Sequence, residues 1–94
     1  MFSREYYIYH IPVFVFGETE PKVDIPQFCA DIEEMLPQSV MRNVEVCYIA
    51  DNPILDGRNA AYSDGAIYMK LDEPTNDDMI ENFVHEVAHA VETD

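Results

Sequence analysis

The chain has 94 residues, enough for one small domain with a single hydrophobic core and too few for two cores. Its hydrophobic content of 48% excludes a largely disordered protein. Nineteen acidic residues against five basic ones give a net charge of −14, which excludes direct binding to nucleic acid or to an anionic membrane surface through phosphate contacts. Such a charge suits two other classes of partner, divalent cations and basic protein surfaces.

The first predicted strand lies in the aromatic and β-branched segment 6–16 (YYIYHIPVFVF). Pro12 has no N–H to donate to a neighbouring strand, so we expect an arm before it and a buried strand, 13–16, after it. A polar loop, 18–24, follows. The N-terminal segment lacks the pattern of a signal peptide, and no apolar run approaches the length of a membrane span, so a cytoplasmic location is expected.

A helix is predicted over residues 26–36, because it starts with a proline and its apolar residues recur at helical spacing. Residues 44–50 (VEVCYIA) are predicted to form a second strand. Cys29 and Cys47 lie on the apolar faces of these two elements and lack a C-x-x-C spacing. We interpret them as small buried hydrophobic residues in a reducing compartment, and a disulfide between them is the alternative.

Residues 60–62 and 66–70 flank the turn sequence Ser63-Asp64-Gly65 and are predicted to form a short hairpin or a bent edge strand. A last helix is predicted from about Asn76 to the end of the chain, with Thr75 or Asn76 as its N-cap. The order strand, helix, strand, hairpin, helix predicts a single domain of the α+β class. Its small mixed sheet would have three to four strands and two covering helices.

The last predicted helix contains His85-Glu86-Val87-Ala88-His89, which has the H-E-x-x-H spacing of zinc sites. Residues four apart in a helix lie on one face, one turn from each other, so both imidazoles can bind one metal ion. Glu86 stands beside them and can take a proton from a zinc-activated water. The alternative interpretation is a pair of solvated histidines on an acidic surface.

A rotation of 100° per residue places the histidines on a polar face and the apolar residues opposite them. We therefore expect Phe83 and Val87 to be buried against the sheet, and His85 and His89 to face a groove. The polar face also carries the carboxylates of Asp78, Glu81 and Glu92, and the apolar side carries Met79, Ile80, Phe83, Val84, Val87, Ala90 and Val91.

Two of these carboxylates, Asp78 and Glu92, are candidates to accept hydrogen bonds from the second N–H of the imidazoles. Glu92 is a weaker candidate for the third zinc ligand, because it lies about 10 Å along the helix from His85. Zinc is the cofactor that this residue set predicts, and hydrolysis of a peptide or protein substrate is the reaction, with Glu86 as the general base.

The sequence Asp64-Gly65-Ala66-Ile67-Tyr68, followed by an acidic loop and the helix 84–92, resembles the zincin family of zinc metallopeptidases. The resemblance is to small uncharacterised members, some of them carried by phages. It covers about residues 60–92 well and the N-terminal part only in outline. In that family an edge strand precedes the active-site helix and lies along the cleft. Zincins take a third protein ligand from beyond the helix, so the resemblance implies an N-terminal half that is incomplete at its C-terminus.

Under this resemblance the substrate would lie along an edge formed by Ala66, Ile67 and Tyr68, adding a strand through main-chain hydrogen bonds. Tyr62 and Tyr68 flank this edge and could polarise a carbonyl, although tyrosines in strands more often have a packing role.

Two alternatives to an active metallopeptidase remain. One is a non-catalytic acidic interaction protein, such as a phage-encoded inhibitor that mimics nucleic acid and binds a basic protein partner. The other is a degenerate zincin that binds metal weakly and hydrolyses nothing.

Overall fold

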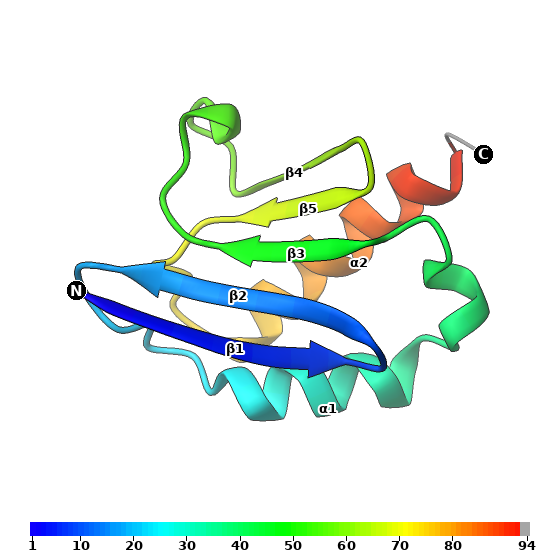
Figure 1. Ribbon diagram of the computed structural model, residues 1–94, viewed down its shortest axis with the longest axis horizontal. Coiled ribbons are helices and arrows are strands. Elements are labelled where there is room, and N and C mark those ends of the chain that lie inside the picture. Colours follow the sequence, from blue (N-terminus) through cyan, green and yellow to red (C-terminus); the bar gives the residue numbers. More distant parts are fainter. Residues whose placement is uncertain (93–94) are drawn as a thin grey trace.

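Five strands form one mixed sheet in the order β1-β2-β3-β5-β4 in the computed structural model, which describes residues 1–92 (Figure 1). Two helices complete the α+β fold, so the predicted class, the mixed sheet and the number of helices are confirmed. The predicted count of three to four strands is too low. The elements are β1 Phe2–Ile8, β2 Ile11–Gly17, α1 Ile25–Met35, β3 Val46–Ile49, β4 Ala60–Ser63, β5 Ala66–Met69 and α2 Asn76–Glu92, with short 3₁₀ turns at Gln38–Met41 and Pro53–Leu55.

The additional strand is β1, at the position where the sequence predicts only an arm. It pairs antiparallel with β2 along its whole length, and the chain reverses at Tyr9, whose φ is +55°. Pro12 does not interrupt the hairpin: it lies opposite Tyr7, and β2 pairs with β3 only from Val13 onward. The proline therefore needs no N–H towards β3.

The centre of the sheet is parallel and its margins are antiparallel. Strand β3 pairs parallel with both β2 and β5, and β4 pairs antiparallel with β5. The predicted hairpin 60–70 is confirmed. Its turn is Asp64-Gly65, with φ of +48° and +84°, the positive φ pair of a two-residue type I′ turn.

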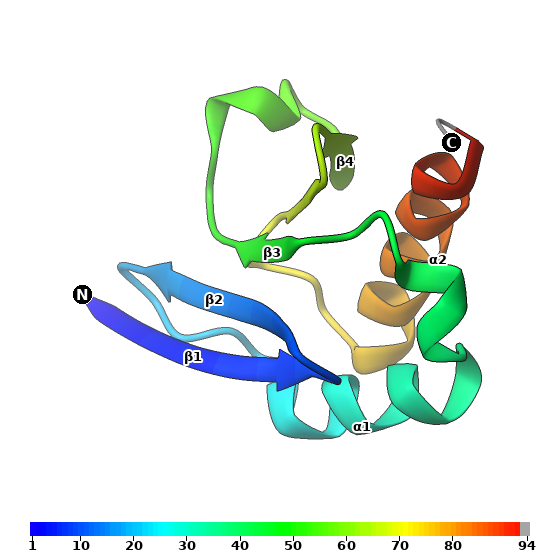
Figure 2. The same ribbon diagram turned by 45° about the vertical axis from the view of Figure 1, so that its right-hand side comes forward.

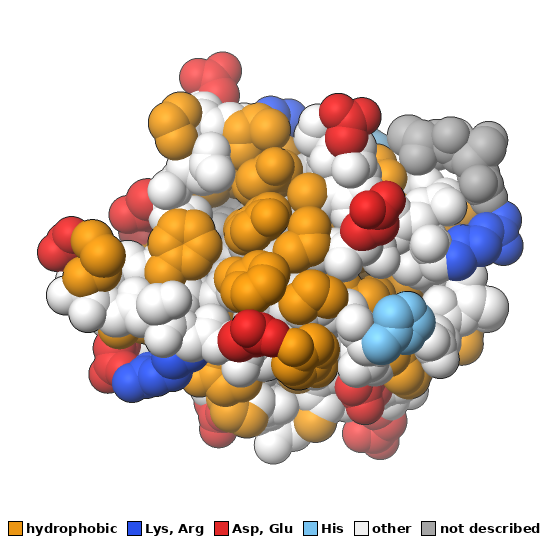
Figure 3. Space-filling view, in the orientation of Figure 1, with side chains coloured by type: hydrophobic (Ala, Val, Ile, Leu, Met, Phe, Trp, Pro, Cys, Tyr) orange, Lys and Arg blue, Asp and Glu red, His pale blue; other side chains and the backbone are white. Residues whose placement is uncertain are grey.

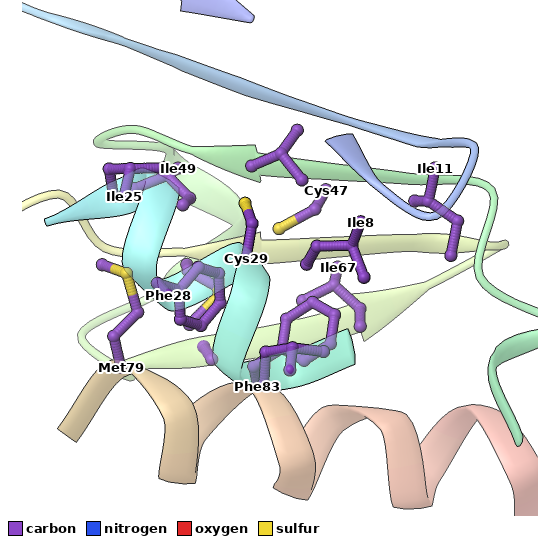
Figure 4. Packing of buried hydrophobic residues seen from close by; sticks show 14 of the residues in the cluster. Ile8, Ile11, Ile25, Phe28, Cys29, Cys47, Ile49, Ile67, Met79 and Phe83 are labelled. Carbon is purple, nitrogen blue, oxygen red and sulfur yellow. The ribbon is translucent and has the colours of Figure 1, made fainter. Parts of the chain in front are cut away.

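Both helices cover the same face of the sheet (Figures 1 and 2). The core between them is apolar, and Phe28 of α1 packs edge-to-face against Phe83 of α2 with ring centroids 5.6 Å apart. Cys29 and Cys47 lie in this core as free thiols, as predicted from the sequence (Figure 4). Burial raises the pKa of the Cys29 thiol to about 12, with a contribution from Glu33, and burial likewise raises the pKa of Cys47.

Helix α2 is anchored at both ends by side-chain hydrogen bonds. At its start, the Asn76 side chain accepts from the Asp24 N–H and donates to the Asp24 carbonyl, both at 2.9 Å. Asp24 is itself the N-cap of α1, so the two helix starts are joined. Near its other end, Asn43 Nδ2 donates to the Ala90 carbonyl at 2.9 Å. The residues between these anchors are thereby held in a fixed orientation to the sheet.

The start of α2 has the cap that the sequence predicts. The Thr75 hydroxyl accepts a hydrogen bond from the Asp78 N–H at 3.1 Å and donates to the Asp78 carboxylate at 2.9 Å. This satisfies one of the unpaired N–H groups of the first turn. No helix within residues 1–92 is both long and apolar enough to cross a membrane.

Candidate metal site

Helix α2 presents its histidines to solvent and its apolar residues to the core. Phe83 is fully buried and Val87 is 2% exposed, whereas His85 and His89 are exposed. The predicted orientation of the helix is therefore confirmed. The buried stripe is narrower than the sequence pattern suggests, because Ile80 and Val84 are only partly buried and Val91 is exposed.

The two imidazoles converge. His85 Nε2 and His89 Nε2 lie 3.1 Å apart, and the ring planes meet at 84° with centroids 4.7 Å apart. This distance suits a proton shared between the rings. It also suits two ligands of one ion, since two nitrogens each 2.0–2.1 Å from a tetrahedral zinc ion lie about 3.3 Å apart. To become a pair of zinc ligands, the two Nε2 lone pairs would have to point at one ion instead of at each other.

Glu86 differs from its histidine neighbours because it is only 7% exposed. It lies about 100° around the helix from His85, at the border of the buried stripe. Its carboxylate has no hydrogen-bond or ion-pair partner among residues 1–92, and no side-chain oxygen in that part of the chain is both fully buried and unpartnered. The carboxylate therefore opens onto the groove beside the histidines.

This groove has a volume of about 660 Å³ and runs between α2 and the edge of the sheet. Helix α2 supplies Asn82, His85, Glu86, His89 and Glu92 to its walls, and the opposite wall is Arg58, Asn59, Ala60 and Tyr62. Since β4 pairs with β5 on one side only, its other edge is unpaired within residues 1–92. An imidazole pair, a carboxylate and a free strand edge thus meet in one groove.

The prediction that Ala66, Ile67 and Tyr68 form the free edge of the sheet is wrong. Ala66, Ile67 and Tyr68 form β5, which is paired with β3 on one side and β4 on the other. The edge strand is β4, because the crossover from β3 places β5 next to β3 and leaves β4 outside. Tyr68 also points to the opposite face of the sheet, where it stacks on Tyr48.

Of the two predicted hydrogen-bond partners of the histidines, the structure brings only one to the groove. Glu92 lines it together with His89. Asp78 does not, because its carboxylate is bound to Thr75 at the start of the helix, about 10 Å from His85 along the axis. No group of three His, Cys, Asp or Glu side chains that could hold a metal ion occurs within residues 1–92, so the site has two converging ligands there.

Tyr62 lines the groove, but its hydroxyl is engaged in the fold. It accepts a hydrogen bond from the Gly65 N–H at 3.2 Å and lies 3.4 Å from the Asn43 carbonyl, to which it donates. This ties the β4–β5 turn to the segment that precedes β3. We assign Tyr62 a structural role.

Three groove residues are not predicted from the sequence: Arg58, Asn59 and Asn82. Arg58 is fixed by hydrogen bonds from its guanidinium to the carbonyls of Leu55 and Ile54, both at 3.1 Å. Asn82 lies three residues before His85, so its helical position could have indicated it. The two residues before β4 carry no local signal, because only the sheet order places them opposite α2.

Comparison with models of protein families, with curated proteins and with solved structures finds no match for this chain. The chemistry of the groove therefore has to be inferred from its own residues. These are two converging imidazoles, a carboxylate that opens onto the same space, and an unpaired strand edge facing them.

Proposed function

We propose that this chain forms part of a zinc-dependent metallopeptidase of the zincin type. His85 and His89 would hold the ion, and Glu86 would be the general base. The observation that carries this proposal is the 3.1 Å separation of the two Nε2 atoms, together with the opening of Glu86 onto the same groove. The hydrogen bond between the two rings brings both Nε2 atoms to one point of the groove, beside the carboxylate of Glu86.

The donor set fits zinc in its chemistry, although it is incomplete within residues 1–92. Neutral imidazole nitrogens are favoured zinc ligands, and catalytic zinc usually has three protein ligands. A complete site of this kind therefore needs a further donor besides the two imidazoles. Bound in this groove, zinc would supply a water of lowered pKa and a Lewis acid for the peptide carbonyl.

The position of Glu86 in the groove supports the role of general base. Glu86 is adjacent to His85 in the sequence, and the two buried neighbours Phe83 and Val87 fix the rotation of the helix that aims it into the groove. As a carboxylate it would accept a proton in the first half of the reaction and pass it to the leaving amine in the second. Its low exposure leaves few bulk waters to compete for that proton.

The substrate would bind along β4, which faces the histidines across the groove. An extended peptide can add a strand to a free sheet edge through main-chain hydrogen bonds, which hold it irrespective of most side chains. Arg58 and Asn59 precede β4 on the same wall and would contact the residues at one end of such a peptide.

Zinc titration by calorimetry tests the metal site. The wild-type chain is expected to bind about one equivalent weakly, since two imidazoles are fewer than the ligands of a complete site. The double variant His85→Ala/His89→Ala should lose this binding. His10→Ala is the matched control, because His10 bonds to Gln38 and takes no part in the groove. Equal zinc binding by wild type and the double variant would overturn the proposal.

A second function, docking of a basic partner by a non-catalytic acidic protein, is favoured by the net charge of −14. It predicts tight binding to a basic protein that survives His85→Ala/His89→Ala. The two functions are therefore separated by the same double variant.

A further inference from the structure

The sheet has a second apolar face, which neither helix covers. On this face, residues that are paired from strand to strand form one row across all five strands. The row consists of Glu5, Phe14, Tyr48, Tyr68 and Ala61. The neighbouring inward row, which includes Val13, Cys47 and Ile67, faces the helices. Strand β2 (IPVFVFG) is apolar at nearly every position, which suits a strand covered on both sides.

The aromatic members of the row pack against one another. Phe14 and Tyr48 stack with ring centroids 5.8 Å apart, and Tyr48 and Tyr68 stack with centroids 5.4 Å apart. All three side chains are only partly buried. Hydrophobic side chains form a continuous band across the strands on this face of the molecule (Figure 3). A contiguous exposed apolar band of this kind typically marks a binding surface.

The margin of the band is acidic. Glu5 ends the row on β1, directly opposite Phe14, and Asp64 is exposed in the β4–β5 turn. Acidic side chains border the band (Figure 3). A second copy of the chain would bring the same charge of −14 to the same surface, so repulsion disfavours a homodimer. Charge complementarity instead favours a basic occupant.

Arginine is the residue whose chemistry matches both parts of this surface. Its planar guanidinium stacks on aromatic rings and pairs with carboxylates, and it loses hydration more readily than a lysine ammonium. The chain contains a small example of this combination. Arg4 lies over the Phe2 ring, 5.7 Å from its centroid, and forms an ion pair with Glu20.

We propose that the aromatic face formed by Phe14, Tyr48 and Tyr68 binds an arginine-bearing segment of a basic partner protein. The surface lies on the opposite face of the sheet from the histidine groove, so the proposal does not depend on zinc or on peptidase activity. The rings would stack with the guanidinium groups, and carboxylates such as Glu5 and Asp64 would pair with them at the margin.

The test uses two labelled peptides of equal charge, eight arginines and eight lysines, titrated with the 94-residue chain at physiological salt. Fluorescence anisotropy should show binding of the arginine peptide about tenfold tighter than that of the lysine peptide. The variant Tyr48→Thr/Tyr68→Thr should abolish this preference, since threonine keeps strand propensity but removes the rings. Met35→Gln, an exposed apolar residue on the helix side, is the matched control and should bind like wild type.

Nuclear magnetic resonance on the wild-type chain keeps the test independent of whether the variant folds. The arginine peptide should shift the amide signals of β2, β3 and β5. Shifts confined to the acidic helix α2, or equal affinity for both peptides, would overturn the proposal. The proposal would also be overturned if sedimentation showed that the wild-type chain is a dimer and that the variant Tyr48→Thr/Tyr68→Thr is a monomer. His85→Ala/His89→Ala should leave peptide binding unchanged, which separates this outcome from failure of the zinc site.

Discussion

The side-chain amide of Asn82 donates a hydrogen bond to the carboxylate of Glu73, which is only 3% exposed. Lys70 Nζ lies 3.7 Å from the same carboxylate. Glu73 lies in the loop that leads from β5 to α2, so this contact joins the loop to a residue that lines the histidine groove. A buried charge in such a place needs its partners, because an unpaired carboxylate there would cost more than the hydrogen bond itself contributes.

We expect Asn82→Ala to lower the free energy of unfolding by about 1–3 kcal/mol, since it removes one partner of the buried Glu73 carboxylate. Asn59→Ala is the control, because Asn59 lines the same groove but is exposed, and its loss should change stability by about 0.5 kcal/mol or less. Urea denaturation followed by circular dichroism measures both. Equal stability of the two variants would contradict a role for Asn82 in satisfying Glu73.

Helix α2 provides a second pair of variants with opposite expected effects. Phe83→Ala deletes a fully buried ring that packs on Phe28, so it should cost about 3–5 kcal/mol of unfolding free energy. His85→Ala, two residues along, removes an exposed side chain and should cost about 0.5 kcal/mol or less. The urea concentration at the midpoint of unfolding, compared at an unchanged m-value, tests both expectations. A large loss of stability in His85→Ala would indicate that the imidazole pair supports the fold.

Elements with local signals are predicted well from the sequence. Prolines at positions 26 and 37 bracket α1, Asp64-Gly65 marks the hairpin turn, and Thr75 caps α2. Strand β1 is missed for a physical reason. Its reversal at Tyr9 has no glycine to indicate positive φ, and the proline rule concerns donors to a neighbouring strand, which the sequence alone does not identify.

Only part of the site is predicted from the sequence. Some of its features depend on one helix alone, and others depend on how distant strands are arranged in the sheet. The histidine spacing and the polar face of α2 are properties of a single helix, so His85, Glu86 and His89 follow from the helical period. Which strand forms the edge depends on a crossover between β3 and β5, and no local pattern records it. The burial of Glu86 has the same origin, since β4 and the core determine which side of the helix is enclosed.

The buried thiols predict a loss of stability at alkaline pH. The pKa values of Cys29 and Cys47 are raised in the folded state, so folded thiols stay protonated where unfolded ones, with an ordinary pKa of about 8.5, ionise. Their contribution is fully present below about pH 8.5 and is lost as the pH rises towards the folded values. Each thiol should lose about 2.6 kcal/mol between pH 8 and 10.5, so we expect wild type to lose about 5 kcal/mol more than Cys29→Ala/Cys47→Ala.

Urea denaturation at pH 8 and at pH 10.5 measures the free energy of unfolding of both proteins. Comparing the change between the two pH values, protein by protein, cancels the effect of the substitutions themselves on stability. Native alkylation provides a second readout. Iodoacetamide should label neither thiol at pH 8 without denaturant and both thiols in denaturant. Rapid labelling of the native chain, or identical pH dependence of the two proteins, would contradict the burial of the thiols as the cause.

The final prediction concerns catalysis. Glu86→Gln retains the size of the side chain and both histidines but removes the base, so it should leave zinc affinity nearly unchanged and lower peptide hydrolysis by about 10²–10⁴-fold. Glu81→Gln is the matched control, because Glu81 is exposed on the same helix and does not line the groove. Cleavage of a peptide library by the 94-residue chain and by any longer form of the protein, with and without a chelator, is the measurement.

The result of this experiment separates the roles of the groove residues. Since residues 1–92 supply two converging ligands, the 94-residue chain alone should show little or no chelator-sensitive cleavage. Robust cleavage by that chain would mean that Glu92, a water or a second copy completes the site. If Glu86→Gln and Glu81→Gln cleave equally well, Glu86 is not the base. If every form is inactive while zinc binding still requires His85 and His89, the groove is a metal site without hydrolysis, and a degenerate zincin becomes the better account.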